Sequence, residues 1–150
     1  MNPNKRFSIG GAEKATGVKV VTIRYYEHIG LMPKPIRTKG NYRTYNQEHL
    51  ARLVFIRRCR DLGFTLGQIH DFVALSAQDE GACAEVDRIT TTRLKEIEWR
   101  ISDLTRLADE LRRIKSRCPG KGRIADCRIL EALAFPKLRD HPRAPPRSTG

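Results

Sequence analysis

The spacing of three cysteines around one long helical segment constrains this chain more than any other feature of its sequence. Between Cys83 and Cys118, apolar residues recur at alternating steps of three and four, as in the seam of a coiled coil: Leu94, Ile97, Ile101, Leu104, Ala108 and Leu111. A helix of that length separates its ends by roughly 50 Å at ~1.5 Å per residue, so one chain cannot bring both cysteines to a common ion. We therefore expect two copies to pair in antiparallel fashion, with Cys83 of one chain beside Cys118 and Cys127 of the other.

The distribution of charge points to a polyanionic partner. The 150-residue chain carries a net charge of +12, and Lys and Arg outnumber Asp and Glu by 13 to 5 in residues 1–75 but by 16 to 12 in residues 76–150. A positive field concentrated in the N-terminal half is typical of proteins that bind nucleic acid, with an anionic membrane surface as the second candidate. The simplest alternative is a basic protein without such a partner.

Signals for membrane insertion or export are not evident. No apolar run approaches the roughly 18 residues that span a bilayer, and residues 1–7 do not form the hydrophobic region of a signal peptide. We therefore expect a cytoplasmic protein without a membrane partner. Because disulfides are disfavoured in that compartment, its four cysteines are better interpreted as core residues, metal ligands or redox sensors.

The capping and turn residues near the N-terminus predict a helix-turn-helix. Ser8 can cap a short helix over Gly11–Ala15, and Gly17 ends it. A second helix follows over Lys19–His28, with Val20, Ile23 and Glu27 expected on one side and four other residues toward the opposite side: Lys19, Thr22, Tyr25 and Tyr26.

The residues that follow this motif predict a small wing. Alternating residues at Ile36–Arg37 and Tyr42–Tyr45 flank the turn Thr38–Asn41, which is the pattern of a β-hairpin. Two further helices are expected over Glu48–Asp61 and from Thr65 to Leu75, each preceded by a capping residue.

A winged helix-turn-helix binds DNA by placing its second helix in the major groove and its wing on phosphates or the adjoining minor groove. We predict that the contacts come from Lys19, Thr22, Arg24, Tyr25, Tyr26, Lys39, Tyr42 and Arg43. The alternative for Tyr26 and Tyr45 is a role as core aromatic residues.

The four cysteines divide into two groups. Cys59 lies three residues after Ile56 on an apolar helix stripe, so we interpret it as a small core residue. Cys83, Cys118 and Cys127 flank helix ends in glycine-containing loops and are candidate metal ligands. Three thiolates favour a soft, thiophilic ion, whereas structural zinc sites and iron-sulfur clusters normally have four protein ligands.

Two questions about these cysteines stay open at this level. Asp126 and His141 are conceivable additional ligands, although each is more simply a solvated surface residue. The cysteines can also be interpreted as a thiol-based redox sensor, because basic residues near Cys118 would favour a reactive thiolate. An enzyme is not indicated, since the sequence has no Cys-x-x-Cys pair, no glycine-rich cofactor motif and no evident Cys/His couple.

These patterns predict a mainly α fold of four parts. Residues 1–76 form a winged helix-turn-helix head, and residues 77–117 form a linker and the long helix of an antiparallel coiled-coil dimer. Residues 118–135 form the metal-binding loop and a short helix, and residues 136–150 form a disordered tail rich in Pro and Arg.

Three motifs occur together in the first half of the chain: Thr22-Ile23-Arg24-Tyr25-Tyr26-Glu27, Gly40-Asn41-Tyr42-Arg43-Thr44-Tyr45, and Leu62-Gly63-Phe64-Thr65-Leu66 followed by Ile69. In these motifs the sequence resembles the MerR family of bacterial transcription regulators, and the similarity extends from about Phe7 to about Leu133. The resemblance implies a DNA-binding homodimer that acts at promoters together with RNA polymerase.

Within that family, Cys83, Cys118 and Cys127 match the ligands of the divalent-metal sensors. The match around Arg117-Cys118-Pro119 and Asp126-Cys127 is nearest to mercury sensors, and the cadmium/lead sensors are almost as similar. Copper sensors of the family have another residue in place of Cys83, and zinc sensors generally add a Cys or His in the loop. The resemblance therefore implies a soft divalent metal ion as effector, mercury in the first place and cadmium or lead as alternatives.

The resemblance also implies a mechanism. The dimer sits on a palindromic promoter whose polymerase-recognition elements are too far apart and out of phase, and it represses transcription without metal. Metal binding shifts the coiled coil, and the heads then bend and underwind the DNA so that polymerase reads both elements.

Overall fold

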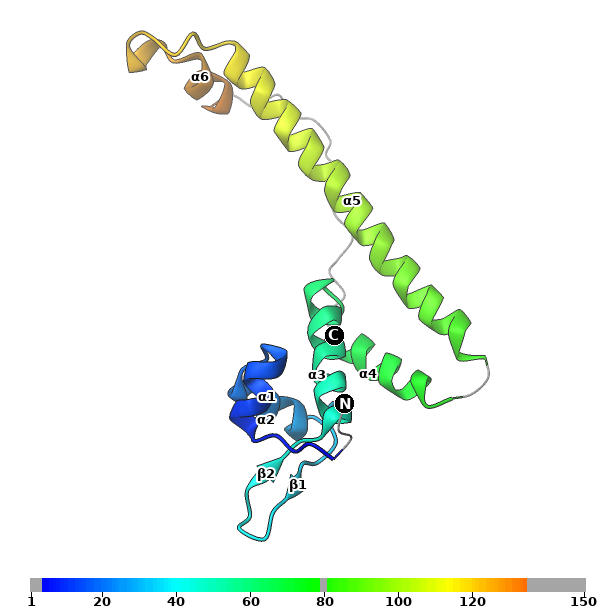
Figure 1. Cartoon of the computed structure of the whole chain (residues 1–150). Helices are drawn as coiled ribbons and strands as arrows, with labels where there is room; N and C mark the ends of the chain where they lie inside the picture. Colours follow the sequence, from blue (N-terminus) through cyan, green and yellow to red (C-terminus); the bar gives the residue numbers. More distant parts are fainter. Residues whose placement is uncertain (1–3, 79–80, 135–150) are drawn as a thin grey trace. The chain divides into compact units, whose positions relative to one another are not determined.

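The computed structural model describes residues 4–78 and 81–134 of the chain. The described residues are mostly helical, and the long helix predicted after the winged head is present (Figure 1). The elements in chain order are α1 (Ile9–Thr16), α2 (Val20–His28), β1 (Ile36–Arg37), β2 (Arg43–Thr44), α3 (Gln47–Asp61), α4 (Leu66–Ser76), α5 (Ala82–Ser116), the 3-10 helix η1 (Ile124–Asp126) and α6 (Arg128–Ala134). The tail predicted over residues 136–150 lies outside the described residues.

The turn between α1 and α2 forms as its sequence predicts. The Ser8 hydroxyl accepts a hydrogen bond from the Gly11 N–H at 3.0 Å, which satisfies one of the free donors at the start of α1. Gly17 ends the helix in the left-handed conformation, with φ of 71°. Across this turn, Arg57 of α3 donates from Nη1 to the Thr16 carbonyl at 2.8 Å, so α3 holds the turn in place.

Gly17→Ala is expected to lower the free energy of unfolding by about 2 kcal/mol, because alanine is strained in the left-handed region and the Arg57–Thr16 hydrogen bond is lost. The hydrogen bond is lost because a β-carbon at Gly17 would overlap with the Arg57 guanidinium. Gly67→Ala in the first turn of α4 is the matched control, since a β-carbon there meets nothing closer than 3.8 Å. Urea unfolding of both variants measures the difference, and equal stability would contradict this account of the turn.

The wing is a two-stranded antiparallel ribbon in which Ile36 pairs with Thr44 and Arg37 with Arg43. Its second strand is shorter than the predicted Tyr42–Tyr45, because Tyr45 leaves the ribbon and exchanges backbone hydrogen bonds with Phe7 at 2.8 and 2.9 Å. This bridge ties the start of the chain to the base of the wing.

The head is held together by a core under α3 and α4. Both helices begin with a reciprocal capping box, between Asn46 and His49 in α3 and between Thr65 and Gln68 in α4. The predicted apolar stripe of α3 is buried, and with α4, α2 and the wing base it forms one cluster whose most enclosed members are Ile23, Leu31, Tyr45, Leu53, Ile56 and Ile69. Leu66 and Val73 of α4 are half-buried beside this cluster.

The compact N-terminal unit extends to Thr90. Ile89 joins the buried cluster of the head, and Val86 packs against it. The first turns of α5 therefore belong to the head, and the second unit begins at Thr91.

The second unit contains the rest of α5, η1 and α6. Helix α5 begins at Ala82 and ends at Ser116, within the range 77–117 expected for the linker and the long helix. Its predicted seam is confirmed as an apolar stripe on a helix, and four of its members are more than half exposed: Leu94, Ile101, Leu104 and Leu111. No helix in the described part of the chain is both long and apolar enough to cross a membrane.

Candidate nucleic-acid interface and metal-ligating cysteines

Helix α2 presents most of its predicted DNA-contacting side chains to solvent. Lys19, Arg24 and Tyr25 are exposed, and Thr22 is half-buried. Lys19 precedes the helix in an extended conformation and caps it without a side-chain hydrogen bond, so its ammonium group is not used in the cap. Two exposed cations, Lys19 and Arg24, and the exposed ring of Tyr25 are suited to contacts with phosphates and base edges.

Tyr26 corrects the sequence interpretation, which placed it on this exposed face. Only 7% of the residue is exposed, and it belongs to the core cluster of the head. Ile23 and Tyr26 are three residues apart, so they lie on the same side of α2 and turn inward together. Burial raises the pKa of the Tyr26 hydroxyl above its ordinary value. Tyr26 is therefore a core aromatic residue, and so is Tyr45, which is fully buried.

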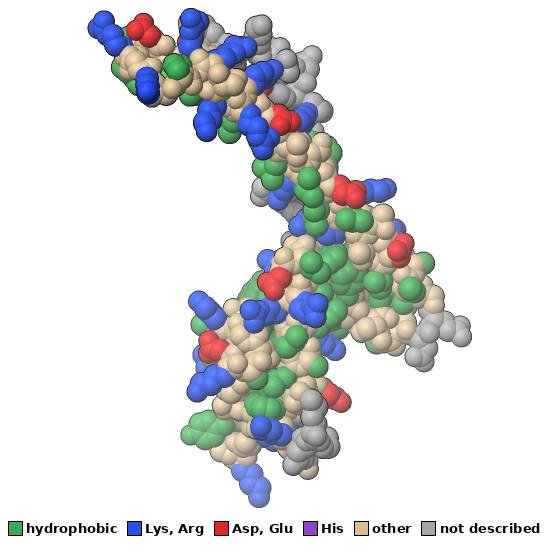
Figure 2. Space-filling view, turned by 45° about the horizontal axis from the view of Figure 1, so that its top comes forward, with side chains coloured by type: hydrophobic (Ala, Val, Ile, Leu, Met, Phe, Trp, Pro, Cys, Tyr) green, Lys and Arg blue, Asp and Glu red, His purple; other side chains and the backbone are tan. Residues whose placement is uncertain are grey.

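The wing carries the other predicted contacts. Lys39 and Tyr42 are exposed at its tip, Tyr42 to 75%. The tip is held by Thr38, whose carbonyl accepts from the Asn41 N–H at 2.9 Å and whose hydroxyl accepts from the Tyr42 N–H at 3.2 Å. The ring of Tyr42 lies so close to Gly40 that a β-carbon there would meet it at 3.1 Å. In the face shown in Figure 2, Lys and Arg side chains far outnumber Asp and Glu over the head.

A carboxylate that sequence reasoning did not assign to the interface connects α2 to the wing. Arg43 donates from Nε to Oε2 of Glu27 at 3.2 Å, and the Tyr45 hydroxyl donates to Oε1 of the same carboxylate. Burial in the first place, and then this hydrogen bond, raise the pKa of Tyr45. The sequence does indicate that this carboxylate has a partner. Glu27 falls on the same side of α2 as Ile23, and a carboxylate that faces inward without a partner would be unfavourable.

The structure separates Cys59 from the other three cysteines as the sequence predicts, but it places Cys83 within a helix and not in a loop. Cys59 is buried in the head core, and burial raises the pKa of its thiol, so its interpretation as a core residue is confirmed. Cys83 is exposed in the first turn of α5, and Cys118 and Cys127 are half-buried on either side of the loop before α6; all are free thiols. Asp126 lies exposed at the end of η1, whereas His141 lies outside the described residues.

A single chain does not assemble a metal site from these residues. Among residues 4–78 and 81–134, no three His, Cys, Asp or Glu side chains gather closely enough to hold an ion. Helix α5, with Cys83 in its first turn, has 35 residues and is roughly 50 Å long at ~1.5 Å per residue. The three thiols are a suitable donor set for a soft ion.

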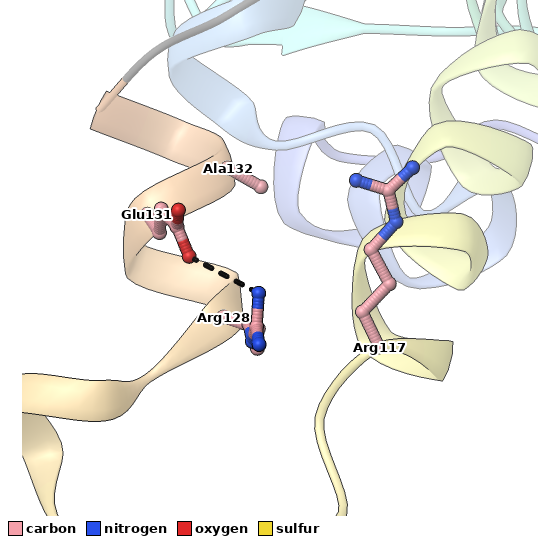
Figure 3. A pocket seen from close by; sticks show the side chains of 4 residues that line it. All are labelled: Arg117, Arg128, Glu131 and Ala132. Carbon is pink, nitrogen blue, oxygen red and sulfur yellow. Dashed lines mark ion pairs between the residues drawn. The ribbon is translucent and has the colours of Figure 1, made fainter.

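The residues next to Cys118 and Cys127 are basic. Arg117 follows the end of α5, and across from it α6 contributes Arg128, Glu131 and Ala132 to a shallow pocket (Figure 3). The Arg128 guanidinium lies 3.9 Å from the Glu131 carboxylate, a loose surface pair. Cys118 and Cys127 each have an arginine as an immediate neighbour in sequence, Arg117 and Arg128.

Comparison with known proteins decides the family. The model described as MerR HTH family regulatory protein matches residues 7–75, and the model described as MerR, DNA binding matches residues 50–114. A mercuric resistance operon regulatory protein of Bacillus cereus is 40% identical over 128 residues, which cover 85% of this chain and 97% of that protein. The chain belongs to the MerR family.

Two solved structures of MerR family proteins have the same fold. The transcription regulator PbrR691 from Ralstonia metallidurans CH34, in complex with lead(II), has a TM-score of 0.72 and 35% identity over 85% of this chain and 98% of its own. MerR from Bacillus megaterium MB1, in complex with mercury(II), has a TM-score of 0.66 and 37% identity over 86% of this chain and all of its own. Members of the family are DNA-binding transcription factors, so this MerR protein is a regulator and not an enzyme.

Proposed function

We propose that this MerR family member is a metal-responsive regulator that binds a palindromic promoter as a homodimer. The dimer represses transcription without metal. When it binds a soft divalent ion, in the first place mercury(II), it distorts the DNA and activates transcription. Such a regulator works beside the promoter and RNA polymerase, in the cytoplasm. The observation that carries the proposal is the placement of three free cysteines at the two ends of one long helix.

The dimer is supported by the apolar stripe of α5. Four members of this stripe are exposed to more than half of their surface in a single chain: Leu94, Ile101, Leu104 and Leu111. Such a stripe is stable in water only when another apolar surface covers it, and the spacing suits a second helix of the same kind. An antiparallel arrangement places the start of one α5 beside the end of the other.

That arrangement completes the ligand set. Cys83 of one chain would join Cys118 and Cys127 of the other, so that each end of the dimer has three thiolates and two equivalent sites form. Thiolates select soft ions, and three of them without a fourth protein ligand suit mercury(II) better than tetrahedral zinc. The Bacillus cereus relative and the structure with mercury(II) support the same choice.

Two alternatives remain within this proposal. Cadmium(II) or lead(II) is the nearer one, since PbrR691 was crystallised with lead(II), while zinc(II) is less favoured for want of a fourth ligand. The other is a thiol-based redox sensor, which is supported by the basic residues around the cysteine loop. Both keep the same fold and the same DNA interface.

The head supplies the DNA contacts in this proposal. We assign base and phosphate contacts to seven exposed or half-buried residues of α2 and the wing: Lys19, Thr22, Arg24, Tyr25, Lys39, Tyr42 and Arg43. Tyr26 supports them from the core of the head. Metal binding would change the DNA through the two heads by a coupling free energy of ~1–3 kcal/mol, which corresponds to a change of roughly 5- to 150-fold in the population of the active promoter.

A transcription assay that compares effectors tests the proposed function. The full-length protein, its promoter and RNA polymerase are incubated with mercury(II), cadmium(II), lead(II) or zinc(II) at equal concentration in the same thiol buffer, and with hydrogen peroxide alone. We expect transcription to rise most with mercury(II). Activation by peroxide without metal would contradict the metal-sensing proposal, and activation by zinc(II) above all others would contradict the three-thiolate site.

A further inference from the structure

The ion pair between Glu27 and Arg43 connects α2 to the wing, and Glu27 itself is not assigned to a DNA contact. Both carboxylate oxygens of Glu27 accept hydrogen bonds, Oε2 from Nε of Arg43 at 3.2 Å and Oε1 from the Tyr45 hydroxyl. The Glu27 side chain is 9% exposed and that of Arg43 32% exposed. A carboxylate that is nearly enclosed and doubly bonded has a fixed position, unlike an exposed ion pair on a helix surface.

This carboxylate is the polar link between the two DNA-facing elements. No other hydrogen bond or ion pair found among residues 4–78 joins α2 to β2. The wing itself has only two residues in each strand, so its own ladder fixes its direction weakly. Glu27 therefore supplies the polar contact that holds β2 against the recognition helix.

Arg43 is bonded in a way that leaves it able to contact DNA. Its Nε is used by Glu27, and no hydrogen bond from its two terminal nitrogens is found within the described residues. A guanidinium held on one side by a carboxylate can still donate from its other edge to a phosphate. Glu27 would thus orient the cation as well as the wing.

We propose that Glu27 is a positioning residue for DNA recognition, which aligns the wing with the recognition helix and orients Arg43 toward the DNA. The inference rests on the proposed DNA-binding function of the head. It makes an acidic side chain necessary for specific binding to a polyanion. Charge alone gives the opposite expectation, because removing a negative charge from a DNA-facing surface strengthens the attraction to phosphate.

The test measures binding to two DNA duplexes. The first is a palindromic duplex selected from a random library by the full-length wild-type protein, and the second is a scrambled duplex of the same length. Affinities for both are measured by fluorescence anisotropy over a range of salt concentrations, and thermal unfolding is recorded without DNA. The variants are Glu27→Gln, Arg43→Ala, their double mutant, and Glu48→Gln as the matched control, since Glu48 is an exposed carboxylate at the start of α3.

Glu27→Gln is expected to bind the selected duplex about tenfold more weakly, which is the loss expected for a hydrogen bond to a charged group. Its affinity for the scrambled duplex should be unchanged or higher, so the ratio between the two duplexes falls. The losses of the two single variants should not add in the double mutant, because the ion pair between Glu27 and Arg43 is already absent in Arg43→Ala. Glu48→Gln should keep the wild-type ratio.

Equal or tighter binding of Glu27→Gln to the selected duplex would overturn the inference, and so would losses that add in the double mutant. If Glu27→Gln unfolds, Tyr45→Phe decides the matter, because it removes one hydrogen bond from the same carboxylate without changing any charge. We expect Tyr45→Phe to bind the selected duplex severalfold more weakly with an unchanged salt slope; wild-type affinity would overturn the inference.

One further variant separates this inference from the proposed function. Arg24 is exposed on α2, and Arg24→Ala should weaken binding to the selected duplex and flatten its salt dependence. If Arg24→Ala binds like the wild type, the DNA interface itself is misassigned and both proposals fail. If Arg24→Ala weakens binding and Glu27→Gln does not, the positioning role alone is wrong.

Discussion

Cys83→Ser is expected to abolish the transcriptional response to mercury(II), cadmium(II) and lead(II) while DNA binding survives. Serine keeps the shape of the residue but replaces a soft thiolate by a hydroxyl, which is a poor ligand for these ions. Removing one of three ligands should lower metal affinity by more than roughly 100-fold, since the loss of an outer partner of a ligand alone reaches that value. Cys83 is exposed in the first turn of α5, so its replacement should leave the fold intact.

Cys59→Ser is the matched control for this result. Cys59 is buried in the core of the head, and its thiol has no place in the proposed site. The variant should lose some stability, because a hydroxyl is placed among apolar side chains, but the folded protein should respond to metal as the wild type does. A folded Cys59→Ser protein without a metal response would contradict the ligand assignment, and so would a Cys83→Ser protein that still responds.

The head could be predicted from the sequence because its elements are marked by local signals. Ser8, Asn46 and Thr65 each cap a helix as expected, since a short polar side chain before an apolar period satisfies the free N–H groups of the first turn. Gly17 ends α1 because the left-handed turn between the helices needs a residue without a side chain. Signals of this kind act within a few residues and do not depend on the rest of the fold.

The errors and omissions arose where the fold brings distant residues together. Tyr26 was placed on the exposed face because a tyrosine beside Tyr25 and Arg24 suits DNA equally well in sequence, and only packing against the core shows which ring is enclosed. The pairing of Glu27 with Arg43 joins residues 16 positions apart and has no local pattern. The burial of Ile89 has no local pattern either, since it depends on the core that the residue meets.

The metal site is of another kind, because its geometry does not exist within one chain. The sequence identified three thiols and their spacing, and the structure confirms that they are free and that the first of them lies in the first turn of a 35-residue helix. Which chain completes which site depends on how two copies of α5 pair. The exposed apolar stripe and the spacing of the cysteines both favour the antiparallel arrangement, and this arrangement is the central claim of the account.

The most direct measurement of that claim is the metal stoichiometry of a mixed dimer. One chain carries Cys83→Ser and the other Cys118→Ser, and two different affinity tags allow the mixed dimer to be purified away from both homodimers. Each homodimer lacks a complete three-thiolate site. In the mixed dimer, Cys83 of the second chain meets Cys118 and Cys127 of the first, while the opposite site lacks two ligands.

Mercury(II) binding is then measured under a thiol competitor for the wild type, the two homodimers and the mixed dimer. The account predicts two tight sites in the wild-type dimer, none in either homodimer and one in the mixed dimer. A mixed dimer that binds no more mercury(II) than either homodimer would show that the cysteines do not meet across an antiparallel interface, and would contradict the account.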